Sequence, residues 1–230
     1  MKPYYKHNGV TLYCGDAREI LPELGQVEAI ITDPVWPDAD AGIPGGDRPY
    51  ELFQEVCAVL PKLERLVIQL GCDSDPRFLL AVPKELPFLR TCWLRYARAT
   101  YKGRLLMTSD VAYAFGKWPD FIKGRQLIGA ETMSTQADRL FIRGTGRRGD
   151  KSKTAAVIES LPHPCPRRLE HVKWLVHQFS DKQVVDPFAG SGTTLLAAKN
   201  LGRKAIGIEI KEEYCALAVK RLSQMVMELN

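Results

Sequence analysis

The sequence predicts an α/β fold with a mostly parallel, twisted sheet and one antiparallel hairpin. Short apolar runs rich in β-branched residues alternate with segments whose apolar residues lie three and four apart, which is the pattern of a doubly wound sheet. Residues 27–32 and 183–186 are such runs, and residues 168–179 have the helical spacing. An aspartate stands at the end of each run. Because ligands bind beyond the carboxyl ends of the strands in these sheets, we expect the functional residues there.

Each predicted element rests on a local pattern. Residues 27–32 (VEAIIT) and 66–70 (LVIQL) are apolar runs of strand length. Residues 50–60 have helical spacing and end at Pro61, whereas residues 38–49 are rich in glycine, proline and aspartate and predict a loop. The other predicted strands are 183–186 and 204–210, with 88–96 and 110–115 as the hairpin, and the other predicted helices are 17–24, 168–179, 212–229 and one that begins at Thr193.

The composition is that of a folded globular protein. The 230 residues are 45% apolar and 26% charged, which excludes a disordered or fibrous chain. The length fits a single domain over 1–230. Between residue 117 and about residue 160 the composition shifts toward glycine, threonine, serine and arginine, which predicts an insert. The formal net charge of +5 leans mildly toward a polyanionic partner.

The cysteines and the N-terminus favour the cytoplasm. None of the six cysteines forms a Cys-x-x-Cys pair, which is typical of a reduced, intracellular protein. The first residues lack the apolar core of a signal peptide, and no apolar run reaches about 18 residues, so we expect no membrane segment. The histidines and cysteines match no closed zinc pattern, and no metal site is predicted.

A glycine-rich turn after residues 183–186 predicts a cofactor site. The turn reads DPFAGSGTT over 186–194, and its glycines, Gly190 and Gly192, let the backbone approach a ligand closely. Glu209 lies nineteen residues after Gly190 at the end of the next strand, where an acid can accept both hydroxyls of a ribose. Asp186 suits a cationic amine. An adenosine that carries an amino acid, such as S-adenosylmethionine, satisfies both ends.

Three other interpretations of the glycine turn compete with this one. A phosphate-binding loop would need a lysine after Gly192, and none is present. In a dinucleotide-binding turn the third glycine would stand at the position of Leu195. A purely structural turn would not explain the spacing of Glu209.

The segment Asp33-Pro34-Val35-Trp36 predicts the chemistry. The exocyclic amine of a nucleobase is a poor nucleophile, because its lone pair is delocalised into the ring. A carboxylate and a carbonyl oxygen that accept both amine hydrogens would direct that lone pair toward a methyl donor. Asp33 and the Pro34 carbonyl are suited to this role, and Trp36 offers a flat face on which a flipped base can stack.

These motifs resemble those of the DNA amino-methyltransferases, and the order of catalytic segment and cofactor turn is similar to the beta-type permutation of that family. Residues 13–16 (YCGD) and 163–169 (HPCPRRL) resemble two further segments of the family. The resemblance implies a Rossmann-like fold that uses S-adenosylmethionine, with catalytic roles for Asp33, Pro34 and Trp36. It implies cofactor contacts at Asp16, Asp33, His163, Asp186, Phe188, Gly190, Ser191, Gly192, Thr193 and Glu209.

The chain departs from the family pattern at two places. Val35 stands where the family usually has a second proline, and Arg167-Arg168 stands where it often has Lys-Pro. An aspartate at the head of the catalytic segment is more typical of the adenine enzymes, so the resemblance favours adenine N6. Cytosine N4, an RNA substrate and a small-molecule substrate stay open. An inactive DNA-binding module and a nucleotide hydrolase are further alternatives.

Two basic segments predict a double-stranded DNA partner. Residues 90–104 contain five basic residues and no acid, and residues 139–153 contain six basic residues and one acid. A solvated surface is the competing interpretation. The resemblance places target recognition in 117–160. Within it we expect DNA contacts at basic residues that lie among glycines and serines, where their side chains can project: Arg143, Arg147, Arg148, Lys151 and Lys153. Dimers occur in similar proteins, so a homodimer is one expectation. The resemblance connects the chain with restriction-modification, and the compact size suggests an orphan enzyme from a phage or a mobile element.

Overall fold

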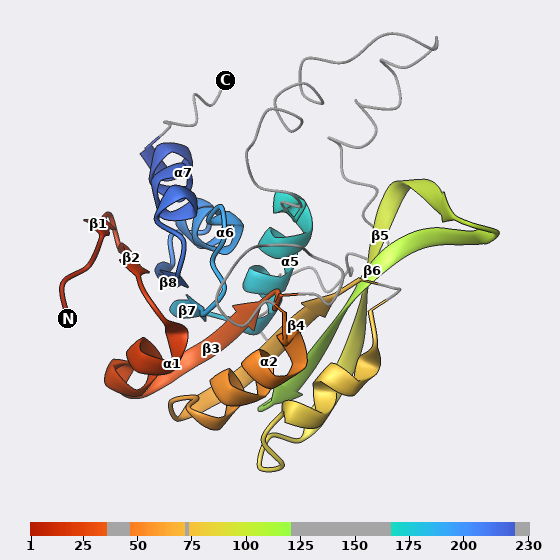
Figure 1. Cartoon of the computed structure of the whole chain (residues 1–230), viewed down its shortest axis with the longest axis horizontal. Coiled ribbons are helices and arrows are strands. Elements are labelled where there is room, and N and C mark those ends of the chain that lie inside the picture. The colour runs from red at the N-terminus through yellow and green to blue at the C-terminus, as the bar shows by residue number, and fades with distance from the viewer. Residues whose placement is uncertain (36–46, 72–73, 121–166, 224–230) are drawn as a thin grey trace, which may run out of the picture.

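The computed structural model of the chain describes residues 1–35, 47–71, 74–120 and 167–223 (Figure 1). These residues form an eight-stranded sheet in the order β1-β2-β8-β7-β3-β4-β6-β5. The strands are β1 (Tyr5–His7), β2 (Val10–Cys14), β3 (Val27–Thr32), β4 (Leu63–Leu70), β5 (Phe88–Lys102), β6 (Leu105–Gly116), β7 (Gln183–Asp186) and β8 (Lys204–Glu209). The five neighbours from β2 to β4 are parallel, whereas β1 at one edge and the β5–β6 hairpin at the other are antiparallel.

Helices cover both faces of the sheet (Figure 1). The α-helices are α1 (Ala17–Ile20), α2 (Pro49–Ala58), α5 (Leu169–Phe179), α6 (Thr193–Asn200) and α7 (Glu212–Ser223), and the short 3-10 helices are η1 (Leu21–Leu24) and η2 (Pro76–Ala81). Side chains alternate between the faces along each strand. Ile31 of β3 therefore packs with α5, α6 and α7, while its neighbour Ile30 packs with α1 and α2.

The pairing of β3 decides where the predicted motifs meet. On one side β3 pairs in parallel with β7, through Ala29↔Val184 and Ile30↔Val185. On the other side it pairs with β4, up to Thr32↔Ile68. The catalytic segment and the cofactor turn follow the carboxyl ends of β3 and β7, which are neighbouring strands. They lie side by side although more than 150 residues separate Asp33 from Asp186.

The predicted α/β class, the parallel sheet and the hairpin are confirmed. The predicted strand 27–32 agrees with β3 at both ends, but the hairpin strands extend well beyond 88–96 and 110–115. The short β1–β2 hairpin and η2 were not predicted. Residues 121–160 of the predicted insert and 224–229 of the predicted last helix lie outside the described residues.

Candidate active site

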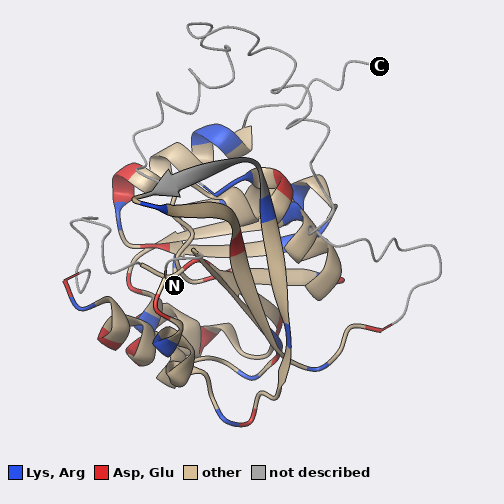
Figure 2. Ribbon diagram, turned by 90° about the vertical axis from the view of Figure 1, so that its right-hand side faces the viewer, with Lys and Arg blue, Asp and Glu red and all other residues tan. Residues whose placement is uncertain are grey.

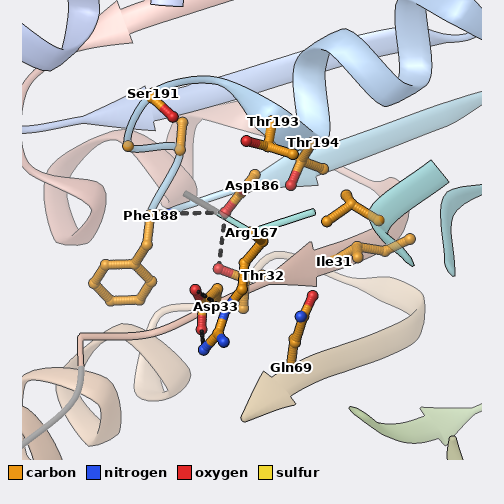
Figure 3. A pocket seen from close by; sticks show the side chains of 13 residues that line it. Ile31, Thr32, Asp33, Gln69, Arg167, Asp186, Phe188, Ser191, Thr193 and Thr194 are labelled. Atoms are coloured by element: carbon orange, nitrogen blue, oxygen red, sulfur yellow. Dashed lines mark hydrogen bonds and ion pairs between the residues drawn. The ribbon is translucent and has the colours of Figure 1, made fainter. Parts of the chain in front are cut away.

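A pocket opens where the carboxyl ends of β3, β4 and β7 meet (Figure 3). Its lining combines the end of β3, one position of β4, the segment from β7 into α6, and residues at and just before α5. The lining residues are Ile31, Thr32, Asp33, Gln69, Arg167, Val172, Asp186, Phe188, Ala189, Gly190, Ser191, Thr193 and Thr194. The pocket thus brings Asp33 of the predicted catalytic segment together with most of the predicted cofactor turn.

Asp186 is a fully buried carboxylate at the centre of this pocket. Its Oδ1 accepts hydrogen bonds from Thr32 Oγ1 at 2.8 Å and from the Phe188 N–H at 3.1 Å. Burial raises the pKa of Asp186 to about 6, against the hydrogen bonds from Thr194, Thr32 and Phe188, which lower it. The Thr32 bond also ties the end of β3 to the end of β7. A cationic ligand at this point would relieve the cost of the buried charge.

The glycine turn has a backbone that only glycine adopts easily. Gly190 and Gly192 have φ angles of +49° and +78°. A Cβ on Gly192 would also lie 2.9 Å from the Cβ of Ala218 in α7, so α7 packs directly against the turn. Arg221 of α7 is hydrogen-bonded to the turn. Its Nη1 donates to the Ser191 carbonyl at 2.6 Å and to the Ser191 hydroxyl at 2.7 Å.

Glu209 ends β8 and is connected to the glycine turn. Its Oε2 accepts the Gly190 N–H and its Oε1 accepts the Lys211 N–H, both at 2.8 Å. Burial raises the pKa of Glu209 above its usual value. The carboxylate does not line the pocket, but the hydrogen bond to Gly190 places it directly behind the turn. Its predicted contact with a ribose stays a prediction.

Asp16 caps the amino end of α1, and its carboxylate is hydrogen-bonded to a neighbouring arginine. It accepts hydrogen bonds from the Arg18 backbone N–H at 2.8 Å and from the Arg18 guanidinium, which also contacts Glu55. These bonds hold the pKa of Asp16 below its usual value. Cys14 pairs with Glu209 across β2 and β8, so Asp16 follows a strand end beside that of Glu209. The predicted contact between Asp16 and a cofactor adenine stays a prediction.

Asp33 is held by an arginine. Arg167 donates from Nε to Asp33 Oδ2 at 2.6 Å and from Nη2 to Oδ1 at 2.8 Å (Figure 3). The same guanidinium donates from Nη1 to Oδ2 of Asp110 in β6, at 2.9 Å. The side chains of Arg167 and Asp110 are 15% and 8% exposed, whereas that of Asp33 is 28% exposed. Asp33 is thus the acid of the pair that a substrate can reach most easily.

Gln69 of β4 lines the pocket beside Asp33 and is 2% exposed (Figure 3). Within the described part of the chain, its buried Nε2 has no hydrogen-bond partner. A buried amide without a partner costs stability, so it needs an explanation, and a ligand in the pocket would supply one. The register Thr32↔Ile68 puts Gln69 on the Asp33 side of the pocket.

The structure describes only some of the predicted site residues. Pro34 is described and buried, whereas Trp36, His163, Arg143, Arg147, Arg148, Lys151 and Lys153 lie outside the described residues. The basic segment 90–104 runs along β5 and into the following turn, with Trp93 half exposed. Basic and acidic positions are interspersed over the described ribbon (Figure 2).

The described residues contain no group of three or more side chains that could hold a metal ion, and no helix among them could span a membrane.

The pocket also contains polar residues that the motifs did not predict. Thr32, Gln69, Arg167 and Thr194 line it, and Asp110 joins it through Arg167. Two of them left a signal in the sequence. Gln69 is the polar interruption in the apolar run LVIQL, and Arg167 is one of the two departures from the family pattern. Nothing in the sequence connects Asp110 with Asp33.

The fold and the pocket define a class of protein. A glycine turn enters a helix from the central strand of a parallel sheet, an acid ends the next strand, and a second motif begins on the neighbouring strand. This is the architecture of α/β proteins that bind a nucleoside cofactor at the point where the strand order reverses. The carboxylate Asp33, beside that site, adds a group that can act on a second substrate.

Comparison with known proteins relates the chain to one family within this class. A family model described as DNA methylase, of the N6 and N4 methyltransferases, matches residues 124–220. The putative methylase YubD of Escherichia coli (strain K12) is 28% identical over 214 residues, which cover 86% of this chain and 82% of YubD. These similarities support an amino-methyltransferase of this family.

A second relative matches only locally. The type II methyltransferase M.ScaI of Streptomyces caespitosus is 50% identical over 50 residues, which are 22% of this chain and 16% of M.ScaI. The match therefore concerns one segment of that protein and does not transfer its activity.

Solved structures support the fold. The chain resembles M1.HpyAVI in complex with SAM, with a TM-score of 0.62, 22% identity, and coverage of 92% of this chain and 99% of that one. It also resembles the cytosine-N4-specific PvuII DNA methyltransferase, with a TM-score of 0.65, 18% identity, and coverage of 98% and 90%. At these identities the likeness concerns the fold.

Proposed function

We propose that the chain is an S-adenosylmethionine-dependent DNA methyltransferase that methylates the exocyclic amine of a nucleobase, with adenine N6 as the preferred target. One observation carries the proposal: Asp33 and Asp186 line the same pocket, on neighbouring strand ends that the Thr32–Asp186 hydrogen bond holds together. A methyl donor bound on the Asp186 side and an amine bound on the Asp33 side would meet in this pocket. The match to the amino-methyltransferase family model supports the same pairing of substrates.

The residues present fit this cofactor. Asp186 is a buried acid whose pKa is raised by burial. The ammonium group of a ligand would neutralise the negative charge of its carboxylate. The backbone of the glycine turn lines the pocket, and Gly190 has no side chain that would block a ligand. When bound, S-adenosylmethionine supplies an electrophilic methyl group. Phe188, which lines the pocket and packs against Phe53, offers an apolar wall to the cofactor.

On the other side of the pocket, Asp33 would orient the target amine. Its carboxylate accepts a hydrogen bond from the amine, and this bond strengthens as the nitrogen becomes positively charged during attack. The Pro34 carbonyl would accept the second amine hydrogen, and Trp36 would stack on the flipped base. The aspartate at the head of this segment favours adenine.

Cytosine N4 is the second candidate. The family model that matches this chain is one of N4 as well as N6 methyltransferases, which supports this candidate. An amine beside a ring nitrogen is common to both bases, so the pocket chemistry is the same in both cases. The proposal has four further parts. Residues 117–160 recognise the target sequence, and the basic residues of that region bind double-stranded DNA. The protein forms a homodimer and acts in the cytoplasm of a bacterial or phage-infected cell.

Genome-wide mapping of modified bases tests the reaction and the target together. The chain is expressed in a host that lacks DNA methylation, with Asp33→Ala as the control. We expect N6-methyladenine at one short recognition sequence with the wild type and none with the control. N4-methylcytosine would establish the second candidate instead. Unmodified DNA, together with wild-type protein that is folded and binds the cofactor, would contradict DNA as the substrate.

Calorimetry tests the cofactor separately. Glu209→Ala should weaken the binding of S-adenosylmethionine by roughly 1.5–3 kcal/mol, because a charged hydrogen bond to the ribose is lost. Arg77→Ala, which changes an exposed residue that does not line the pocket, is the control and should bind as the wild type does. Equal affinity of Glu209→Ala and the wild type would remove Glu209 from the site.

A further inference from the structure

We infer that Gln69 recognises the edge of the target base: its side-chain amide donates a hydrogen bond to the ring nitrogen beside the amine that Asp33 orients. That ring nitrogen is N1 in adenine and N3 in cytosine. The inference rests on the proposed function and deepens it, because it names a contact that selects the base. Gln69 belongs to β4, which carries neither the catalytic segment nor the cofactor turn.

The side-chain amide of Gln69 is a buried donor that the described residues leave unsatisfied. Gln69 is 2% exposed, and its Nε2 has no hydrogen-bond partner in this part of the chain. Gln69 pairs with Ala112 of β6, and Ile31 and Val172 line the same pocket. None of these three side chains can accept a hydrogen bond. Because an unsatisfied buried donor costs stability, the amide indicates a ligand group that accepts its hydrogen.

The sheet places this amide on the Asp33 side of the pocket. β3 and β4 are parallel and Thr32 pairs with Ile68, so Asp33 and Gln69 follow at equivalent positions of neighbouring strands. Asp186 ends β7, which lies on the other side of β3. Figure 3 shows the amide pointing from β4 into the space that Asp33 and Ile31 border. A ligand group at Gln69 is therefore nearer to the target amine than to the cofactor side of the pocket.

The two side chains are complementary to one edge of adenine and of cytosine. Asp33 offers an acceptor, and the amide of Gln69 offers a donor. In both bases the exocyclic amine is a donor, and the ring nitrogen beside it is an acceptor. Thymine and guanine present the reverse pattern, a carbonyl beside a ring N–H. Either of these would place a donor against Gln69 and an acceptor against Asp33, which a buried site rejects.

The test removes the acceptor from the base and the donor from the protein. 1-Deazaadenine, in which C–H replaces the ring nitrogen N1, is placed at the mapped adenine of a short duplex, and kcat/KM is compared with that for adenine. For Gln69→Met, we expect the loss caused by the deaza base to be about tenfold smaller than for the wild type, since the donor is already absent. Effects of the altered ring on amine reactivity and base pairing are common to both proteins and cancel. At a cytosine target, 3-deazacytosine is used in the same way.

Two controls make the comparison specific. 7-Deazaadenine keeps N1 but lacks the ring nitrogen on the far side of the amine, and its loss should be equal for the wild type and Gln69→Met. Gln178→Met makes the same substitution at a buried residue that does not line the pocket. At a temperature where it is folded, it should show the wild-type loss with 1-deazaadenine. If Gln69→Met does not fold, the wild type alone decides, and 1-deazaadenine should be about tenfold worse than 7-deazaadenine as a substrate.

Equal losses with 1-deazaadenine in the wild type and Gln69→Met would overturn the inference, as would equal use of the two deaza bases where only the wild type is compared. A weaker Kd for S-adenosylmethionine in Gln69→Met, with equal losses, would assign the amide to the cofactor instead. Failure of the proposed function is a different result, because the wild type would then transfer no methyl group to DNA with natural bases.

Discussion

Strand β3 has a carboxylate–arginine pair at each end, and the two pairs differ in what surrounds them. At the amino end, Glu28 binds Arg65, which is 3% exposed and also donates to the carbonyls of Phe179 and Lys117. The Glu28 carboxylate accepts three further bonds from the backbone N–H groups of 181–183. At the carboxyl end, Asp33 is partly exposed in a pocket and shares Arg167 with a second acid.

The difference shows how one chemical pair serves two purposes. Around Glu28, carboxylate, guanidinium and backbone groups satisfy one another, so the pair joins β3, β4 and the turn before β7. Around Asp33, the same pocket contains a buried acid with a raised pKa and a buried amide without a partner among the described residues. Such groups cost stability, and proteins keep them where a ligand uses them. The predictions below test whether the two ends differ in this way.

The largest effect on stability is expected at the amino end. Arg65→Met removes the cation that neutralises Glu28 and a donor to two carbonyls, which should lower the free energy of unfolding by about 3–5 kcal/mol. Urea titration measures it. Arg77→Met, at an arginine that is paired but 76% exposed, is the control and should show no measurable change. A loss in Arg65→Met no greater than in Arg77→Met would remove the structural role of this pair.

A substitution of Asp186 should instead raise the free energy of unfolding. Burial raises its pKa from an ordinary value near 3.8 to about 6, so the folded state holds a proton between these pH values that the unfolded state releases. The stability of the wild type therefore falls as the pH rises from about 4 to 6, by about 2–3 kcal/mol in total. Asp186→Asn should be more stable by about that amount at pH 7.5 and equal to the wild type at pH 4. Equal stability at both values would show that Asp186 titrates normally.

The same residue predicts a pH dependence of cofactor binding. Below about pH 6 the free protein must release a proton from Asp186 before the carboxylate can pair with a ligand ammonium. The affinity for S-adenosylmethionine should therefore fall up to tenfold per pH unit below about pH 6. Calorimetry at several pH values follows it, and an affinity that stays constant from pH 7 to pH 4.5 would contradict the role of Asp186.

A smaller gain in the free energy of unfolding is expected from a substitution of Gln69. Gln69→Met replaces an unpartnered buried amide by an apolar side chain of similar length, which should raise the free energy of unfolding by about 1 kcal/mol. Gln178→Met is the matched control, because Gln178 is also buried but its Nε2 bonds His177 at 3.2 Å. That variant should lose stability. A loss in both variants would mean that the two amides are equally satisfied.

Sequence reasoning predicted the parts of the fold that local patterns determine. β3 was correct to the residue because its β-branched run ends in Asp33-Pro34, and the glycine turn was correct because Gly190 and Gly192 have left-handed backbones. The length of β5 was underestimated because its last residues pair only after a shift in register between Arg95 and Thr100. Such pairing depends on the partner strand.

The interior of the site was less predictable. The acids at the strand ends could be found because strand ends are predictable, and their place in one pocket follows from the pairing of β3 with β7. The sharing of Arg167 by Asp33 and Asp110 joins residues 134 and 57 positions apart, and no local pattern encodes it. The orphan amide of Gln69 likewise depends on what packs around it.

The rate of methyl transfer by Asp33→Ala is the most direct test of the account. With tritiated S-adenosylmethionine and DNA that contains the mapped site, we expect a loss of about 3–4 kcal/mol in transition-state stabilisation, which slows turnover by roughly two to three orders of magnitude. Cofactor affinity should stay within about twofold of the wild type, because Asp33 acts on the target amine. Transfer by Asp33→Ala at the wild-type rate would contradict the assignment of this pocket as the active site.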